Sequence, residues 1–271
     1  MPLNVRSASS KHFPPPPEEL WRRRRTALLL YGGVLLALAV TAGWAEISPG
    51  KLLGSLGQSV AFSLRFFPPS VDHLPRFLTA LFETVVMALW GSFLATFLAV
   101  PLALLGARNV AGGAIYLFAR GVMDVLRGLP ELVLALVFVA AIGLGPLPGI
   151  LALALHTSGV VGKLLSESIE TVDPAQVEAV RATGAHPLLV VAYGIWPQVA
   201  PIFSSVTLYH FEVNVRSATV LGLVGAGGIG FELVQTVRAF RFGDAATVIL
   251  LILAAVFVID KISARLRRAL V

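Results

Sequence analysis

No cysteine occurs among the 271 residues, which excludes disulfides, thiol nucleophiles and thiolate metal sites. Charged residues are also scarce, at 13% of the chain. The P-loop motif G-x-x-x-x-G-K-[ST] is missing, and the five histidines form no H-E-x-x-H or comparable metal pair. These absences predict a protein that is not an enzyme, with no catalytic residue, no nucleotide site of its own, no metal and no cofactor.

Apolar residues dominate the chain instead. They make up 56% of it, a share that would leave large apolar patches wet in a water-soluble domain. A helix needs about 20 mostly apolar residues to cross a hydrocarbon core of about 30 Å. We therefore predict an all-α membrane protein with about six transmembrane helices. Their expected positions are residues 26–45, 77–105, 130–142, 150–166, 188–209 and 245–259. The sixth extends only about 22 Å, so flanking residues must help it to cross.

Basic residues flank the apolar runs and give a net charge of +6. Arginines 22–25 precede the first run, and Lys261, Arg265, Arg267 and Arg268 follow the last. This distribution predicts a multi-pass protein of the cell membrane with both termini in the cytoplasm, in contact with the lipid bilayer. Nucleic acid is not an expected partner, because stacking aromatics are not interleaved with these basic residues.

Three regions are expected along the chain. Residues 1–25 are polar and contain Pro14–Pro17, which predicts a disordered cytoplasmic tail. Residues 26–76 should hold the first transmembrane helix and an interfacial segment on the outer side, and residues 77–265 the transmembrane core. A cleaved signal peptide is the competing interpretation of the first apolar run, but the run is long for one and no clear cleavage site follows.

Two features are expected between the second and fourth predicted spans. Residues 114–128 carry Arg120, Asp124 and Arg127 on one helical face, which places that helix at the cytoplasmic boundary, leading into the third span. The Gly- and Pro-rich turn at residues 143–149 separates the third span from the fourth.

A short polar helix is predicted at residues 174–183. Asp173 can cap it, Gln176 can complete a capping box with Asp173, and Gly184 followed by Pro187 ends it. It displays Val177, Val180 and Gly184 along one side, with Glu178 and Arg181 beside them. Two interpretations stay open, an ordinary helix resting on the membrane surface and a docking element for a cytoplasmic partner.

Residues 225–230, Gly-Ala-Gly-Gly-Ile-Gly, match G-x-G-x-x-G, but they lie between two apolar runs and not in the strand–helix context of a dinucleotide site. Gly225, Gly227, Gly228 and Gly230 therefore mark either a flexible turn or a place where the backbones of two subunits approach closely.

The segment that follows Asp173 resembles a known motif. Residues 178–184 and Trp196-Pro197 resemble the EAA loop of ABC importer permeases, which is E-A-A, three residues, G, then nine variable residues before I-x-L-P. The positions in register are Glu178, Ala179, Gly184 and Pro197. The departures are Val180 for the second Ala, Trp196 for Leu, and an Ile displaced by one position to Ile195.

Wider stretches of sequence resemble the phosphonate-type branch of these permeases, over roughly residues 75–265. They are Arg127-Gly-Leu-Pro-Glu131, Tyr193-Gly-Ile-Trp-Pro-Gln198 and Phe211-Glu-Val-Asn-Val-Arg-Ser-Ala-Thr219, the last of which runs into Gly225.

The resemblance implies a type I ABC importer fold with a core like that of the methionine permease. Two permease subunits, identical or paralogous, would form the pore and receive substrate from an extracytoplasmic binding protein. The EAA helix would insert into a cytoplasmic ABC ATPase dimer, which hydrolyses the ATP. This gives Glu178, Ala179 and Gly184, with Val177, Val180 and Arg181 beside them, a coupling role. It places the glycines of residues 225–230 near the outer gate.

The expected cargo is phosphonate or a related phosphorus oxyanion such as phosphite or a phosphate ester. Arg216 and Asn214 are candidates for the anion path, although Arg216 could instead pair with Glu212 one helical turn away. Two other functional classes are open to a protein of this kind. An ion-driven secondary transporter would carry mid-span carboxylates or repeated halves, neither of which is apparent in the sequence. A non-transporting membrane scaffold would use residues 174–183 for docking alone.

Overall fold

The computed structural model describes residues 17–45 and 49–270, which form helices joined by turns. It divides into residues 1–63 and residues 64–271, and each unit is described by itself. The first contains α1 (Pro17–Trp44) and nearly all of α2 (Pro49–Leu64). Residues 24–44 of α1 are long and apolar enough to cross a membrane. Residues 1–16 of the predicted tail lie outside the described residues, but residues 17–25 are helical, so the tail prediction is corrected there.

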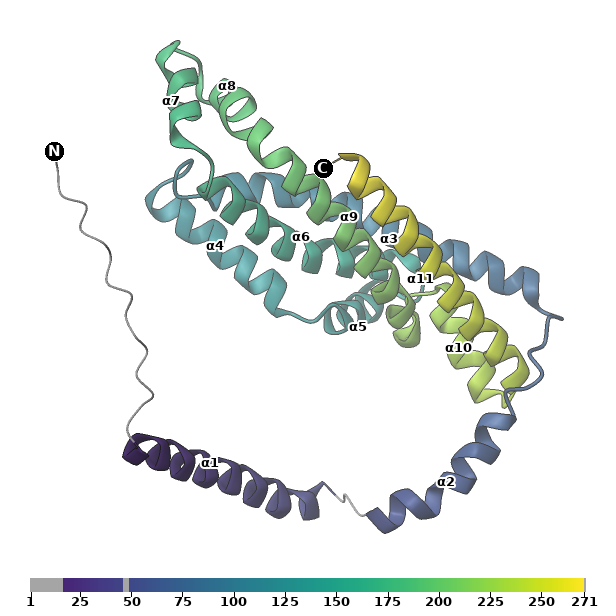
Figure 1. The fold of residues 1–271 in the computed structure, drawn as a ribbon. Helices are drawn as coiled ribbons and strands as arrows, with labels where there is room; N and C mark the ends of the chain where they lie inside the picture. Colours follow the sequence, from purple (N-terminus) through teal and green to yellow (C-terminus); the bar gives the residue numbers. More distant parts are fainter. Residues whose placement is uncertain (1–16, 46–48, 271) are drawn as a thin grey trace. The chain divides into compact units, whose positions relative to one another are not determined.

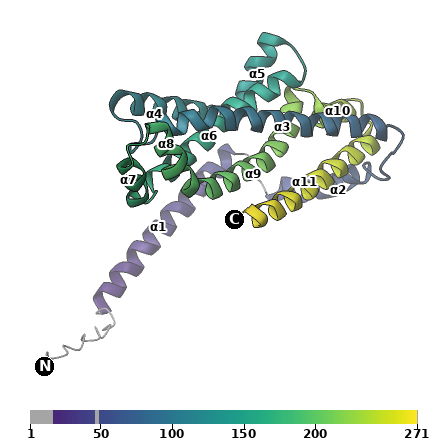
Figure 2. The ribbon, with the colours of Figure 1, turned by 90° about the horizontal axis from the view of Figure 1, so that it is seen from above.

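The second unit is a bundle of long helices with short ones at its ends (Figures 1 and 2). α3, α6, α9 and α11 run side by side, with α7 and α8 at one end and α10 at the other. The helices are α3 (Leu74–Leu105), α4 (Gly113–Gly128), α5 (Glu131–Ile142), α6 (Pro146–Glu170), α7 (Pro174–Ala182), α8 (Pro187–Val190), α9 (Trp196–Leu221), α10 (Gly228–Arg238) and α11 (Phe242–Leu270).

The predicted third span is not a single crossing. α5 has 12 residues and extends only about 18 Å. α4 and α5 together are apolar enough to cross, but their axes differ by 85°. Leu129 is extended (φ −86°, ψ 119°) because Pro130 disfavours a helical conformation in the residue before it. Among the described residues, five helices and this bent pair can cross a membrane, in agreement with the prediction of about six.

The fifth and sixth spans are longer than predicted. The fifth runs from Pro187 to Val224 and the sixth from Phe242 to Arg268. The sequence suggested shorter spans because charged residues interrupt the apolar runs, whereas in the fold Glu212, Arg216 and Asp244 are paired. The Asp244 carboxylate, for example, lies 2.7 Å from Arg241 and 3.5 Å from His73. α10 was not predicted, since its glycine-rich start is typical of a loop.

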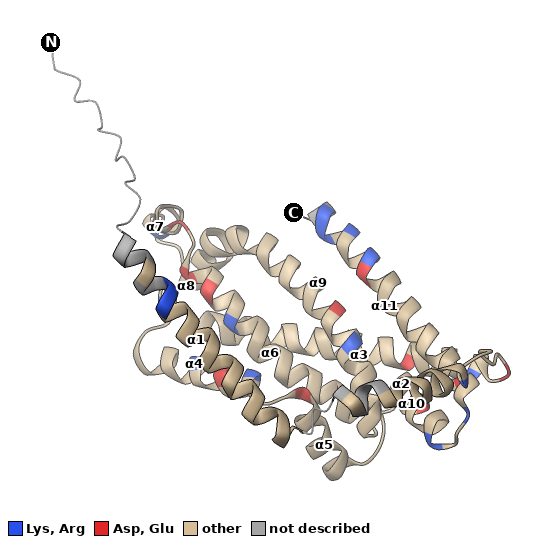
Figure 3. Cartoon of the chain, turned by 60° about the horizontal axis from the view of Figure 1, so that its bottom comes forward, with Lys and Arg blue, Asp and Glu red and all other residues tan. Residues whose placement is uncertain are grey.

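The charges of α4 pair with α6. Arg120 lies 2.9 Å from Glu170 and 3.6 Å from Glu167, and Asp124 lies 3.4 Å from Lys163. The predicted shared face is confirmed, but it is directed at a neighbouring helix. Figure 3 shows that acidic and basic positions also occur part-way along α9, away from its ends.

Glycines allow close helix contact between α4 and α6. A Cβ added to Gly159 of α6 would lie 2.7 Å from the Arg127 nitrogen and 2.8 Å from the Met123 oxygen, both backbone atoms that cannot rotate away. Small residues at such contacts are the usual basis of helix packing in membranes.

We predict that Gly159→Ala lowers the free energy of unfolding by about 1–3 kcal/mol, because α4 must shift away from α6. The measurement is thermal unfolding in detergent. Gly121→Ala is the matched control, because Gly121 is also inside a helix but has open space around its Cβ position. Equal stability of the two variants would contradict this account of the contact.

Candidate coupling helix and pore residues

α7 forms where the capping pattern predicted a helix. The Asp173 side chain accepts a hydrogen bond from the Ala175 backbone N–H at 2.9 Å, which satisfies one of the free donors of the first turn. Gly184 has φ +76° and donates its N–H to the Arg181 carbonyl at 3.0 Å. A left-handed glycine of this kind ends a helix at no steric cost. Local sequence therefore accounts for both ends of α7.

The second half of the predicted capping box is replaced by a long-range contact. The Asp173 N–H donates to Gln198 Oε1 at 2.9 Å, and Gln198 Nε2 donates to the Gly194 carbonyl at 2.7 Å. Gln198, and not Gln176, is therefore the partner of the Asp173 backbone. Because Gln198 belongs to α9, this contact ties the start of α7 to a transmembrane helix.

The side chains of α7 divide into an inner and an outer set. Val177 is buried in a cluster with Leu165 and Ile169 of α6 and with Ile195, and Val180 packs against the same cluster. A Cβ on Gly194 would lie 3.2 Å from Val177 Cα, so the two backbones are close. These valines anchor α7 to its own chain. The outer, exposed set is Glu178, Ala179, Arg181 and Gly184.

The chain between α7 and α9 is irregular. α8 is followed by a π-helical turn, Val191–Ile195, before α9 begins at Trp196. Pro197 and Pro201 lack the N–H that would bond the carbonyl four residues earlier, at Tyr193 and Pro197 respectively. The Gln198 side chain bonds the Gly194 carbonyl within the π-helical turn.

The glycines at residues 225–230 make a tight turn between α9 and α10. Gly225, Gly227 and Gly228 have φ of +95°, +81° and +70°, values that other residues rarely adopt. A Cβ on Gly230 would overlap the Thr219 carbonyl oxygen, so α10 lies directly against the end of α9. The close approach that the glycines suggested therefore exists within this chain.

The turn borders a small pocket that faces away from α7. It has a volume of about 270 Å³ and is lined partly by Glu83, Glu232 and the glycines. Glu232 is held by Arg76 at 2.9 Å. The Thr84 hydroxyl accepts a hydrogen bond from the Ile229 N–H at 2.8 Å, which connects the turn to α3.

The two candidates for the anion path occupy different surroundings. Asn214 is buried, and its amide bridges Thr157 of α6 and Ser92 of α3 at 2.9 Å each. Arg216 is half-exposed and donates to Glu212 at 2.8 Å, and Arg267 of α11 lies 3.2 Å from the other Glu212 oxygen. The alternative pairing of Arg216 with Glu212 is confirmed, and Asn214 joins three helices.

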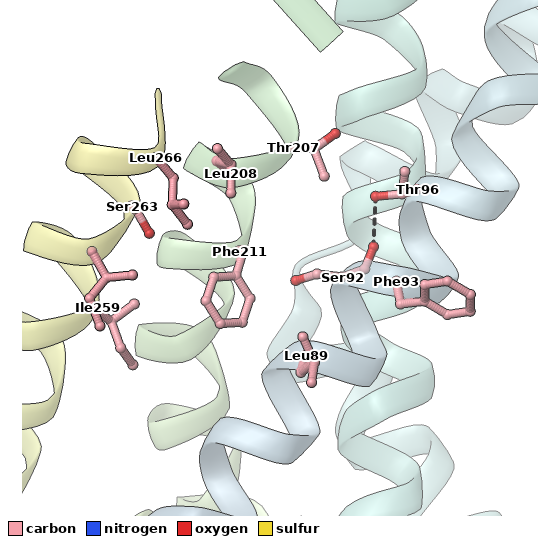
Figure 4. Close-up of a pocket in the computed structure, with 11 residues that line it drawn as sticks. Leu89, Ser92, Phe93, Thr96, Thr207, Leu208, Phe211, Ile259, Ser263 and Leu266 are labelled. Atoms are coloured by element: carbon pink, nitrogen blue, oxygen red, sulfur yellow. Dashed lines mark hydrogen bonds between the residues drawn. The ribbon is translucent and has the colours of Figure 1, made fainter. Parts of the chain in front are cut away.

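An apolar groove of about 500 Å³ lies between α3, α9 and α11 (Figure 4). Leu89, Phe211, Ile259 and Leu266 form its walls, and the polar atoms on its lining are hydroxyls of Ser and Thr. No charged side chain lines it, so it offers nothing to compensate the charge of an anion.

Residues 99–271 match the family described as binding-protein-dependent transport system inner membrane component. The chain belongs to this family. It is thus the permease component of an ABC importer, a multi-pass protein of the inner membrane.

Curated relatives of this permease agree with the phosphonate-type resemblance. It is 41% identical over 218 residues to the phosphite transport system permease protein PtxC of Stutzerimonas stutzeri, covering 80% of this chain and 79% of that one. It is 38% identical over 242 residues to the phosphate-import permease protein PhnE of Mycolicibacterium smegmatis, covering 88% and 46% of the two chains.

Solved structures confirm the predicted fold. An inward-facing structure of the MetNI methionine ABC transporter matches with a TM-score of 0.65 at 21% identity. The match covers 74% of this chain and 99% of the MetNI chain. An amino acid ABC transporter matches with a TM-score of 0.61 at 21% identity, over 73% and 96%.

Two features of the permease escaped sequence reasoning. Gln198 lies in the stretch 193–198 that carried the resemblance, but its spacing from Asp173 does not indicate a contact. Glu131 ends the stretch 127–131, and in the fold it meets His156 and Ser217 from two other helices. The two motif stretches could have marked Gln198 and Glu131 as candidates, but nothing in the sequence indicates which residues they contact.

We predict that Gln198→Ala loosens α7, because the Asp173 N–H and the Gly194 carbonyl each lose a partner. A loss of about 1–2 kcal/mol would speed amide hydrogen exchange in residues 174–182 by about 5–30-fold. Gln176→Ala is the matched control and should leave exchange unchanged. Faster amide exchange in Gln176→Ala than in Gln198→Ala would instead favour the capping box between Gln176 and Asp173.

Proposed function

We propose that this permease is one of two subunits that form the pore of an ATP-driven importer for small phosphorus oxyanions, such as phosphite, phosphonate or phosphate esters. The observation that carries the substrate class is the 41% identity to a phosphite permease over most of both chains. Phosphate and phosphonate permeases among the other relatives support the same class.

The proposed partners are a cytoplasmic ABC ATPase dimer, an extracytoplasmic binding protein and a second permease, either identical or paralogous. The family description includes dependence on a binding protein. Paired permease names from one organism, PhnE1 and PhnE2 of Escherichia coli, support the paralogous form. The basic residues before α1 and at the end of α11 support termini on the cytoplasmic side.

In this proposal α7 receives the movement of the ATPases. Glu178, Ala179 and Arg181, with Gly184 just beyond the helix, are exposed and would contact the ATPase, whereas Val177 and Gln198 would pass the displacement to α6 and α9. A rigidly attached α7 suits this role, since a loose helix would absorb the motion. The turn at residues 225–230 joins the far end of α9 to α10 and α3, where a gate would respond.

The test is reconstitution of the permease with its ATPase and binding protein in liposomes. We expect phosphite uptake that requires ATP, and ATP hydrolysis stimulated by the loaded binding protein. Uptake that persists without the ATPase and follows an ion gradient would contradict the proposal.

We predict that Glu178→Lys abolishes co-purification of the ATPase while the permease keeps its thermal stability, because an exposed charge reversal affects docking and not packing. Gln176→Lys changes an exposed residue on another face of the same helix and should retain the ATPase. Normal co-purification by Glu178→Lys would refute the coupling role.

One observation favours an ion-driven secondary transporter, and another argues against it. No mid-span carboxylate was apparent in the sequence, but in the fold Glu212 lies within α9 and Glu131 at the start of α5. However, both oxygens of Glu212 are engaged by arginines, and Glu131 is engaged by His156 and Ser217. A carboxylate with cationic partners already in place is a poor carrier for a proton or a sodium ion.

A further inference from the structure

The break between α4 and α5 separates two helices that together are apolar enough to cross a membrane. The helices meet at 85°, and Leu129 at the break is 40% exposed on this chain. Non-helical backbone at membrane depth is tolerated only where protein covers it or where it lines a water-filled cavity. At that depth an exposed break would face the pore or the second permease, and not lipid.

Three polar side chains from three helices meet at this break. His156 Nδ1 of α6 lies 2.9 Å from the Leu129 carbonyl oxygen, and His156 Nε2 lies 3.3 Å from Glu131 Oε2 at the start of α5. The Ser217 hydroxyl of α9 donates to Glu131 Oε1 at 2.6 Å. Glu131, His156 and Ser217 are called the junction triad below.

The partners of His156 place a hydrogen on Nδ1. A carbonyl oxygen can only accept, so the contact with the Leu129 carbonyl requires a donor at Nδ1. Glu131 accepts the Ser217 hydroxyl on one oxygen and has its other oxygen 3.3 Å from Nε2. When the imidazole is protonated, His156 and Glu131 form an ion pair at this distance.

The triad is accessible but firmly placed. The side chains of His156 and Glu131 are 23% and 32% exposed. The residue after His156 is Thr157, which hydrogen-bonds the buried Asn214, and Asn214 lies one turn before Ser217 on α9. An accessible ion pair within membrane-spanning helices marks a substrate path by default, because such charges are too costly to face lipid.

Four other cations within the helices, Arg127, Lys163, Arg216 and Arg267, are less suited to release their partners. Arg127 pairs with Asp124 at 3.0 Å within the same helix, and Lys163 adds a second cation to that carboxylate. Arg216 shares Glu212 with Arg267, so those three residues link α9 to α11. His156 shares Glu131 with a neutral serine, so Glu131 keeps the Ser217 hydroxyl as a hydrogen-bond donor when it moves away from the imidazole.

We propose that His156 is the pore residue that contacts the oxyanion, and that Glu131 is its counter-ion when no substrate is present. The arriving oxyanion takes the place of the carboxylate at Nε2, while Ser217 retains Glu131. This inference rests on the proposed function, since it specifies where the oxyanion meets the permease. It also gives a role to the stretch from Arg127 to Glu131.

The experiment measures phosphite uptake in liposomes with the complete transporter and compares His156→Gln, His156→Lys and the double variant Glu131→Gln/His156→Gln. His156→Gln should lower uptake by about 10–100-fold, the loss expected for a charge-assisted contact, while the ATPase still assembles. His156→Lys keeps a cation and should recover most of the uptake.

The double variant separates contact with substrate from a structural role. If His156 served only to neutralise Glu131, removal of both charges would restore uptake, whereas a substrate contact leaves the double variant as low as His156→Gln. His73→Gln is the matched control, because His73 also pairs with a carboxylate, that of Asp244, but lies outside the long helices, and it should transport normally.

Two results would overturn the inference: normal uptake by His156→Gln, or restored uptake in the double variant. Should His156→Gln fail to assemble, the lysine and the charge-neutral double variants decide the question in the same way. Failure of the wild-type transporter to import phosphite would instead count against the proposed function and is visible before any variant is measured.

Discussion

An uncompensated charge or an unpaired backbone group is very costly in hydrocarbon, and this constraint organises the bundle. Arg120 of α4 pairs with Glu170 of α6, Arg267 of α11 with Glu212 of α9, and Arg76 of α3 with Glu232 of α10. Each pair joins helices that are distant in sequence. The apolar surfaces of these helices set no register by themselves, since lipid is an equally good solvent for them. The polar contacts supply that register.

The same constraint explains why polar contacts gather at the interruptions in the helices. Where the helical ladder stops, carbonyls and N–H groups need other partners, and the side chains that satisfy them tie separate segments together. Gln198 does this between α7 and α9, Thr84 between α3 and the turn before α10, and His156 at the break before α5. Movement imposed on α7 would therefore reach α9 through defined contacts.

α9 is the element on which these contacts converge. Its first turn is linked to α7, its middle to α3 and α6 through Asn214 and to α11 through Glu212, and its end to α10 through Gly230. A helix fixed in this way would move as a unit, so a displacement at its α7 end would be felt at the far end. This geometry suits the alternating access expected of the permease family.

Sequence alone determined the features that depend on neighbouring residues. Apolar run length indicated the spans, Asp173 and Gly184 defined both ends of α7, and the motif around residues 178–197 indicated the permease family. The extent of the fifth and sixth spans, the right-angled break before α5 and the partner of Asp173 were decided only in the tertiary structure. Each depends on charges or backbone groups whose partners lie on other helices. Glu131 and His156 are 25 positions apart in sequence, and only helix packing, which no local pattern encodes, brings them within contact.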